Sequence, residues 1–203
     1  MLIRSFGFTF IFLLLSSYVL AQDTLFTQYP NTQQRWEKIF KDDQKIAENV
    51  YHENGTAWMT FQYDKDQTEY YKWFHDNGNP FFEAKNIDGK LQGSYRIWYE
   101  NGQLAEQLYF VDNLENGSAA FFYPNGQLAM KGQYIMGRMS GEWQFFAQDG
   151  SPADGKWEWQ FSALPEFTRM NGSLNNGVPI GNWTYRTTAT TEDGPQEVLV
   201  WGK

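Results

Sequence analysis

The chain has 203 residues, a formal net charge of -8, no cysteine and an aromatic share of 19%. An acidic surface repels phosphate groups, and no basic run is visible, so nucleic acid and anionic lipid headgroups are poor partners for this composition. Without cysteine, disulfides and thiol chemistry are excluded. The fold must therefore be held by packing and by hydrogen bonds.

The first segment, MLIRSFGFTFIFLLLSSYVLAQDT, has the pattern of a secretory signal. A single arginine precedes an apolar run from Phe6 to Leu15. Val19 and Ala21 satisfy the small-residue rule for cleavage, which predicts residues 1–21 as a signal peptide. The run is shorter than the roughly 20 residues that a membrane-spanning helix needs. We expect an exported chain, periplasmic or extracellular, with no stable membrane insertion after cleavage.

Residues 22–45 are predicted to be a degenerate first repeat or an N-terminal lead-in. The triplet YPN that begins at Tyr29 echoes the one that begins at Tyr123. Residues 35–40 read as a strand. The many Gln, Lys and Glu residues between positions 32 and 45 leave a short helix as the competing interpretation.

Between residues 46 and 150 the sequence repeats itself with a period of about 24 residues. The phrases GSYRIWYENGQL, GSAAFFYPNGQL and GEWQFFAQDGSP begin at Gly93, Gly117 and Gly141, and EYYKWFHDNGNP and IAENVYHENGTA precede them in the same register. Each phrase holds an Asn-Gly or Asp-Gly pair, which favours the positive φ of a tight turn. The predicted turn residues are Asn54, Gly55, Asn77, Gly78, Asn101, Gly102, Asn125, Gly126, Asp149 and Gly150.

Runs of six to eight residues between the turns are rich in aromatic and β-branched residues, so each period reads as a β-hairpin. A hairpin cannot bury a face alone, and successive copies must pair edge to edge. The sequence therefore predicts an all-β fold: an elongated antiparallel β-meander built from tandem hairpin repeats of about 24 residues, with about 14 strands.

Residues 151–203 are predicted to hold the last repeats, an insertion and a C-terminal hairpin. The phrase MNGSLNNGVPIGNW at Met170 matches MKGQYIMGRMSGEW at Met130 with an offset of 40 residues. The extra residues fall around KWEWQFSALPEF. An insertion in a repeat array usually forms a loop on one face, often the binding face.

Alternation along SYRIWYE places Tyr95, Ile97 and Tyr99 on one face of the sheet and Arg96 and Trp98 on the other. Aromatic residues on both faces indicate a curled or sandwiched sheet, or one face left free to bind a partner. The candidate binding residues are Trp157 and Trp159 in the insertion, with Trp98, Tyr99, Tyr123 and Trp143 in the repeats.

Nothing in the sequence predicts catalysis. The two histidines, His52 and His75, occupy the same repeat position and would lie about 9.5 Å apart, two strands away from each other. That separation is too large for one metal ion with ligand bonds near 2.1 Å, so they read as members of an aromatic column. No serine has a histidine in register, so we expect no enzyme, no cofactor and no metal.

The repeat phrase G-x-W/Y-x-x-x-Y/F-x-x-N-G-Q-L, closed by G-x-x-x-G, resembles the MORN repeat variant, also described as a YwqK-like antitoxin repeat. The resemblance covers residues 46–150 and, in part, residues 172–185. It implies an interaction scaffold with a protein partner; the antitoxin description implies a toxin. A looser likeness to the aromatic cell-wall-binding repeats of bacterial surface proteins implies a glycan.

We therefore expect an exported, non-enzymatic repeat protein that acts as a protein-interaction scaffold in the cell envelope or outside the cell. Two alternatives stay open at this point. One is an envelope carbohydrate-binding module that uses exposed Trp and Tyr side chains. The other is an antitoxin-like partner of a toxin.

Overall fold

The fold was analysed in a computed structural model that describes residues 23–28, 35–66, 68–160, 169–186 and 197–199. The predicted signal peptide and the first YPN triplet lie outside these residues. The strands are β1 (Asp23–Gln28), β2 (Arg35–Lys41), β3 (Gln44–Tyr51), β4 (Ala57–Tyr63), β5 (Thr68–Phe74), β6 (Pro80–Ile87), β7 (Lys90–Trp98), β8 (Leu104–Val111), β9 (Leu114–Glu115), β10 (Gly117–Phe122), β11 (Leu128–Ile135), β12 (Arg138–Phe145), β13 (Gly155–Gln160), β14 (Arg169–Asn175), β15 (Val178–Arg186) and β16 (Glu197–Leu199).

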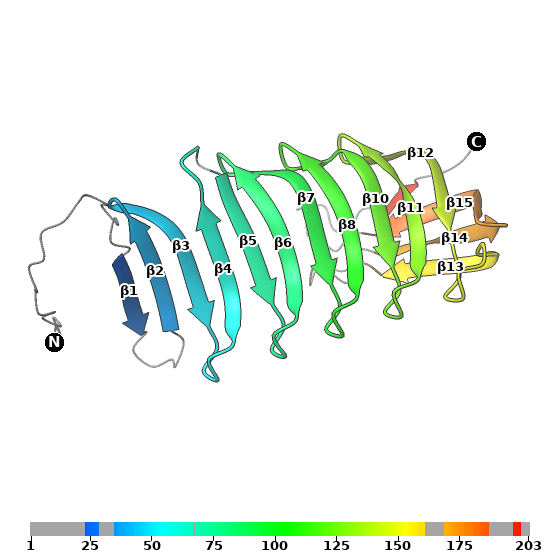
Figure 1. Ribbon diagram of the computed structural model, residues 1–203. Helices are drawn as coiled ribbons and strands as arrows, with labels where there is room; N and C mark the ends of the chain where they lie inside the picture. Colours follow the sequence, from blue (N-terminus) through cyan, green and yellow to red (C-terminus); the bar gives the residue numbers. More distant parts are fainter. Residues whose placement is uncertain (1–22, 29–34, 67, 161–168, 187–196, 200–203) are drawn as a thin grey trace, which may run out of the picture.

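The predicted meander is confirmed. Strands β1 to β12 form one sheet in chain order, with every neighbouring pair antiparallel and the short β9 paired only with β8 (Figure 1). Residues 35–41 form a strand that pairs with β3, so the helix alternative for this segment is wrong. In the part of the chain that the structure describes, no helix is long and apolar enough to cross a membrane.

Each Asn-Gly turn is closed in the same way. The glycine takes a φ of +84° or +85° at Gly55, Gly78, Gly102 and Gly126, a conformation that disfavours other residues. The asparagine side chain accepts a hydrogen bond from the backbone N–H two residues later, as between Asn101 Oδ1 and Gln103 N at 3.0 Å. The turn is therefore specified by its own sequence.

The turns are also linked to one another. The side-chain amide of Asn77 donates to Glu100 O at 2.8 Å, that of Asn101 to Pro124 O at 2.7 Å and that of Asn125 to Gln148 O at 3.0 Å. Each asparagine thus bonds the backbone of the next copy, 23 residues further along the chain. We call this series the turn ladder.

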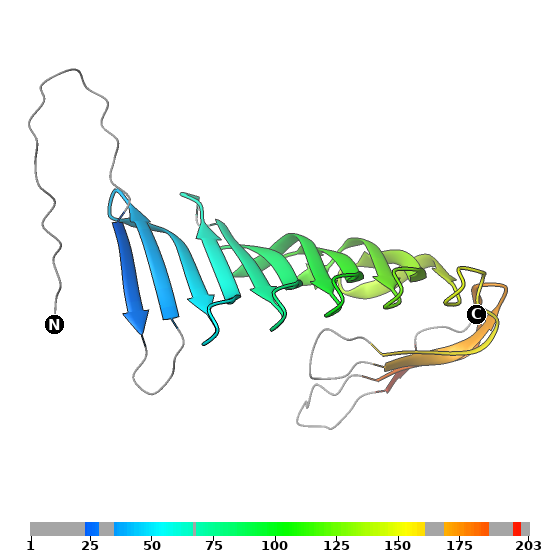
Figure 2. The same ribbon diagram turned by 60° about the horizontal axis from the view of Figure 1, so that its bottom comes forward.

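The last four strands depart from a single meander. Strands β13 to β16 form a second antiparallel sheet, which folds back beneath the end of the long sheet (Figure 2). A buried cluster joins the two sheets: Phe121, Met130, Trp143 and Phe145 come from the long sheet, and Trp159, Met170, Leu174 and Trp183 from the short one. The predicted insertion therefore begins as strand β13 rather than as a loop, and residues 161–168 lie outside the described residues.

Two glycines explain the sequence match at offset 40. A Cβ built on Gly132 would lie 2.2 Å from Trp143 Cδ2, and one built on Gly172 would lie 2.2 Å from Trp183 Cδ2. Each indole therefore rests directly on the backbone of the neighbouring strand. Only glycine permits this contact, so the Gly-Trp pair is repeated in both sheets.

Candidate binding surfaces

The long sheet has two faces of different chemistry. We call the face that the short sheet packs against the inner face, and the opposite one the outer face. Registered pairs place Trp73, Phe82 and Ile97 in one row of the inner face, and Lys72, Glu83 and Arg96 in one row of the outer face. The predicted alternation of Tyr95 and Ile97 against Arg96 is confirmed by these pairs.

An aromatic row crosses the inner face. Ring centroids lie 5.4 Å apart between Trp73 and Phe82, 5.0 Å between Phe82 and Tyr95, and 5.0 Å between Tyr95 and Phe110. The first two contacts are edge-on and the third is tilted, and such ring contacts stabilise neighbouring strands beyond simple burial. The row begins in the single-layered part of the sheet and leads toward the two-layered part.

Burial along the inner face changes from one end to the other. Trp73 is 38% exposed and Phe82 is half-buried, whereas Phe121 is 1% exposed and Phe145 is fully buried. The short sheet accounts for this difference, because Trp157 and Trp183 contact the Phe145 ring at centroid distances of 5.0 and 5.1 Å. The inner face from β4 to β6 thus offers apolar surface of the kind that is buried further along.

Several polar groups on the inner face interact with one another. The Glu48 carboxylate, 7% exposed, accepts from Lys45 Nζ at 2.8 Å and Tyr63 OH at 3.2 Å. Burial, with the nearby Glu69 carboxylate, raises the pKa of Tyr71. Burial and the Glu106 charge likewise raise the pKa of Tyr95. Both phenols therefore stay neutral at ordinary pH.

Rows of mostly polar side chains cross the outer face from strand to strand. Registered pairs connect one continuous row of side chains from β2 to β12: Glu37, Asn49, Thr60, Lys72, Glu83, Arg96, Gln107, Ala120, Lys131 and Gln144. Beside it runs a second series with Gln62, Tyr70, Lys85, Ser94, Tyr109, Ser118, Gln133 and Ser140. Neighbouring members of the first row are eleven or more residues apart in the sequence, and the strand pairing places them side by side.

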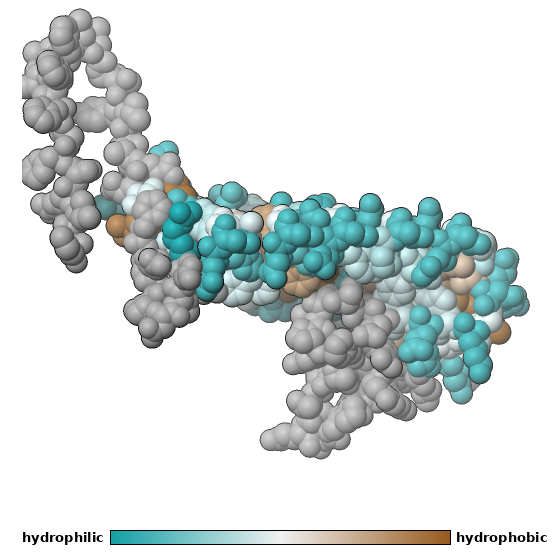
Figure 3. Space-filling model, turned by 90° about the horizontal axis from the view of Figure 1, so that it is seen from below, coloured by the Kyte–Doolittle hydropathy of each residue, from teal (hydrophilic) through white to brown (hydrophobic). Residues whose placement is uncertain are grey.

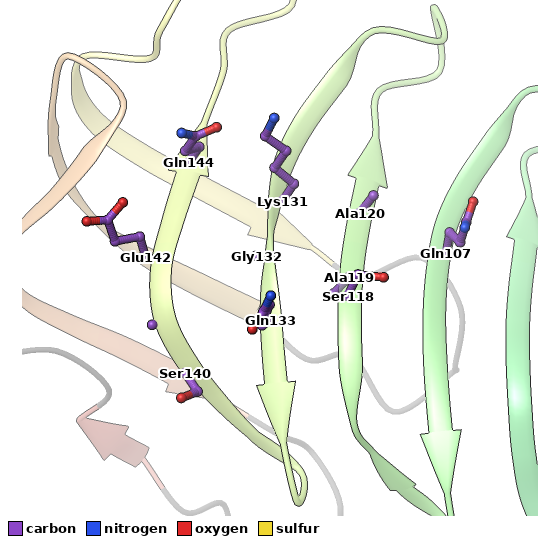
Figure 4. A pocket seen from close by; sticks show the side chains of 11 residues that line it. Gln107, Ser118, Ala119, Ala120, Lys131, Gly132, Gln133, Ser140, Glu142 and Gln144 are labelled. Atoms are coloured by element: carbon purple, nitrogen blue, oxygen red, sulfur yellow. The ribbon is translucent and has the colours of Figure 1, made fainter.

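Two hollows follow one another along these rows. One of about 570 Å³ lies over β8, β10, β11 and β12, and small residues such as Ser118, Ala120 and Ser140 form its floor while Lys131 and Gln144 stand beside it (Figure 4). A second of about 430 Å³ lies over β4 to β7 and ends at Ser94. Ser94 on β7 and Gln107 on β8 line the facing ends of the two hollows on neighbouring strands, with Arg96 and Tyr109 between them. We call them together the outer groove.

The edge with the Asn-Gly turns forms a hydrophilic margin (Figure 3). His75 Nε2 lies 2.9 Å from Trp98 O, and in the next copies Tyr99 OH and Tyr123 OH donate to Phe122 O and Phe146 O at 2.7 and 2.8 Å. His75 therefore plays the same structural part as the tyrosines. Within the described residues, no three His, Asp or Glu side chains gather into a possible metal site.

The structure distributes the predicted binding residues over different environments. Trp143 and Trp159 are buried, at 2% and 8% exposure, and Trp157 is half-buried against Phe145. The expectation of an exposed Trp pair on a loop does not fit this placement, since both rings pack into the core between the sheets. Tyr99 and Tyr123 are half-buried, and their hydroxyl groups donate hydrogen bonds to the backbone of the next copy.

Sequence reasoning missed the outer groove. Trp98, predicted for the face opposite Tyr95, is half-buried at the turn end of β7. Lys72, Lys85 and Tyr109 were not among the candidates, because the residues of this face are spread over the strands from β4 to β12. The one available signal was the alternation of polar side chains along each strand.

The geometry defines the class of the protein: an antiparallel β-hairpin repeat protein with a folded-back C-terminal sheet. Comparison with family models identifies residues 91–112 and 115–136 as two adjacent MORN repeat variants. The comparison with curated proteins found no match. Hairpins β3–β4 and β5–β6, outside the matched segments, keep the same turns and registers. MORN repeats are a non-catalytic repeat family that generally mediates protein or membrane interactions.

Proposed function

We propose that the chain is an exported, non-enzymatic interaction protein of the cell envelope or extracellular space, and that its inner face binds another protein. The observation that supports this most directly is the contrast along that face. Its C-terminal part is buried by the short sheet, whereas its continuation at Trp73 is 38% exposed. This exposed apolar surface continues the contact between the two sheets. It therefore favours binding of another protein that presents an apolar surface of its own.

Export is proposed from the sequence of the first 21 residues. A short apolar run with small residues before Gln22 has the form of a cleavable signal. Cell fractionation of the native host, with mass spectrometry of the N-terminus, tests this directly. A cut after Ala21 in a non-cytoplasmic fraction is expected; an intact N-terminus in the cytoplasm contradicts export and favours the antitoxin-like alternative.

Neighbouring residues provide a matched test of the protein-binding face. Tyr70 and Trp73 lie on the same strand, β5, on opposite faces, and are 40% and 38% exposed. A photo-crosslinking residue placed at either position therefore samples one face at equal accessibility. In the native host we expect one defined protein adduct from position 73.

The crosslinked protein is then purified and its affinity for the full chain measured. We expect Trp73→Glu to abolish binding and Tyr70→Glu to preserve it. Equal crosslinking from both positions, or binding that survives Trp73→Glu, contradicts the assignment to the inner face. Retained thermal stability of both variants excludes unfolding as the cause.

A further inference from the structure

We propose a second, separate binding site: the outer groove binds an extended anionic polysaccharide. This inference does not depend on the protein-binding role of the inner face. It rests on the shape of the groove, on its unpaired lysines and on its exposed tyrosines.

The arrangement of the two hollows suits a long ligand. The two hollows follow one another over β4 to β12, and the basic side chains from Lys72 on β5 to Lys131 on β11 are five strand steps apart. At about 4.8 Å a step, this distance is on the order of 24 Å. A small molecule would fill one hollow only, whereas a polymer that crosses the strands would fill both.

The charge of the groove is opposite to that of the chain. Lys72, Lys85 and Lys131 line the two hollows and Arg96 stands on the row between them, while the chain as a whole carries 16 basic and 24 acidic residues. The acidic residues that line the hollows are Glu83 and Glu142. The groove is thus locally positive on an acidic molecule.

Three of the four basic groups form no ion pair among the described residues, although the charge of Lys85 also acts on the Asp66 carboxylate. Arg96 pairs with Glu83 at 3.1 Å, but no ion pair within the described residues involves Lys72, Lys85 or Lys131. Their ammonium groups lie 5.7 to 5.9 Å from the ring centroids of Phe74, Tyr70 and Phe146. Cation-π contact orients an ammonium group without neutralising it, so these three lysines remain available to an anionic ligand.

The remaining lining suits a sugar better than a peptide. Tyr70 lines one hollow and Tyr109 stands between the two; they are 40% and 49% exposed and offer flat rings to the apolar face of a sugar. Gln107, Gln133 and Ser118 supply neutral donors and acceptors for hydroxyl groups. An acidic peptide would need apolar pockets for its anchor side chains, and large aliphatic residues are absent from the lining of both hollows.

The test compares two variants of the protein, each of which loses three lysine charges: one inside the outer groove and one outside it. Lys72→Gln, Lys85→Gln and Lys131→Gln are combined in one variant of the full chain. Lys41→Gln, Lys65→Gln and Lys156→Gln remove the same charge from exposed positions outside the groove. Calorimetric titration uses polygalacturonate as the anionic glycan. Its methyl ester serves as the uncharged glycan, polyglutamate as the acidic peptide and phosphatidylglycerol vesicles as the anionic lipid.

We expect the unaltered chain to bind polygalacturonate more tightly than the other three probes, with an affinity that falls as salt rises. The groove variant should lose at least about tenfold in affinity, and the matched variant should keep it. Tyr70→Ser with Tyr109→Ser should weaken binding without changing its salt dependence. Absence of binding, equal loss in both lysine variants, or preference for the ester, polyglutamate or vesicles overturns the proposal.

Discussion

The two ends of the long sheet stabilise their inner faces in different ways. From β10 to β12 the inner face is covered by a second sheet, and residues such as Phe145 and Trp183 are fully buried. From β2 to β6 one layer of strands holds itself together through aromatic rows and the turn ladder. Repetition can thus extend a sheet without a second layer, at the expense of leaving apolar side chains partly exposed.

Truncating one phenylalanine in each region should give the largest difference in the free energy of unfolding between the two regions. Phe82 and Phe145 lie in the same row of the inner face, half-buried and fully buried respectively. Phe145→Ala should lower the free energy of unfolding by about 3–5 kcal/mol, and Phe82→Ala by about 1–2 kcal/mol. Denaturant unfolding measures both; equal losses would show that the second layer adds no burial energy.

The next effect comes from the glycine under Trp143. Gly132→Ala should cost about 1–3 kcal/mol, because the added methyl group would lie 2.2 Å from the indole. Two periods earlier, Ala84 pairs with Tyr95 and already has a Cβ. Trp143→Tyr combined with Gly132→Ala should therefore recover part of the loss in denaturant unfolding. Simple addition of the two single losses would contradict this account.

The turn ladder should respond equally in both regions, since it lies at the sheet edge. Asn77→Ala and Asn125→Ala each remove a turn-closing bond and a bond to the next copy. Each change should cost about 1–2 kcal/mol in thermal or denaturant unfolding. Asp149→Ala, which removes only bonds within its own turn, serves as the milder reference. A much larger loss for Asn125 than for Asn77 would mean that the second layer also reinforces the edge.

The smallest effect concerns pH and the single-layered end. Hydrogen bonds from Asn49 and Tyr51 lower the pKa of Glu37 below its usual range. A lowered folded-state pKa contributes stability above the unfolded pKa, and this is lost as pH falls below about 4. Unfolding midpoints measured from pH 7 to pH 3 should fall less steeply in Glu37→Gln than in the unaltered chain. Parallel curves would show that these bonds leave the titration of Glu37 unaffected.

The repeats were predictable from the sequence because their determinants are local. Asn101 and Gly102 specify a turn by themselves, and the 24-residue period places every copy in register. A strand at residues 35–40 was also predicted, although a helix had to be kept as an alternative. Short-range chemistry decides these features, so a single chain contains the information.

The folding back of the last sheet was not predictable in the same way. Trp157 and Trp159 look like an exposed pair in sequence, but their environment depends on Phe145 and Tyr123, which belong to the other sheet. The outer groove was missed for a related reason. Its lysines come one to a strand, so no basic run appears, and only the cross-strand register gathers them.

The turn ladder gives the repeat array a direction. Asn77, Asn101 and Asn125 each donate to the following turn, whereas Asp149 has a carboxylate and no amide to donate. The series therefore stops at the turn after which the chain leaves the meander. Gene duplication that inserts whole copies ahead of Asp149 would preserve every link, and the folded-back sheet would travel intact with the end. The length of such a protein can thus evolve in steps of one hairpin, while its terminus remains unchanged.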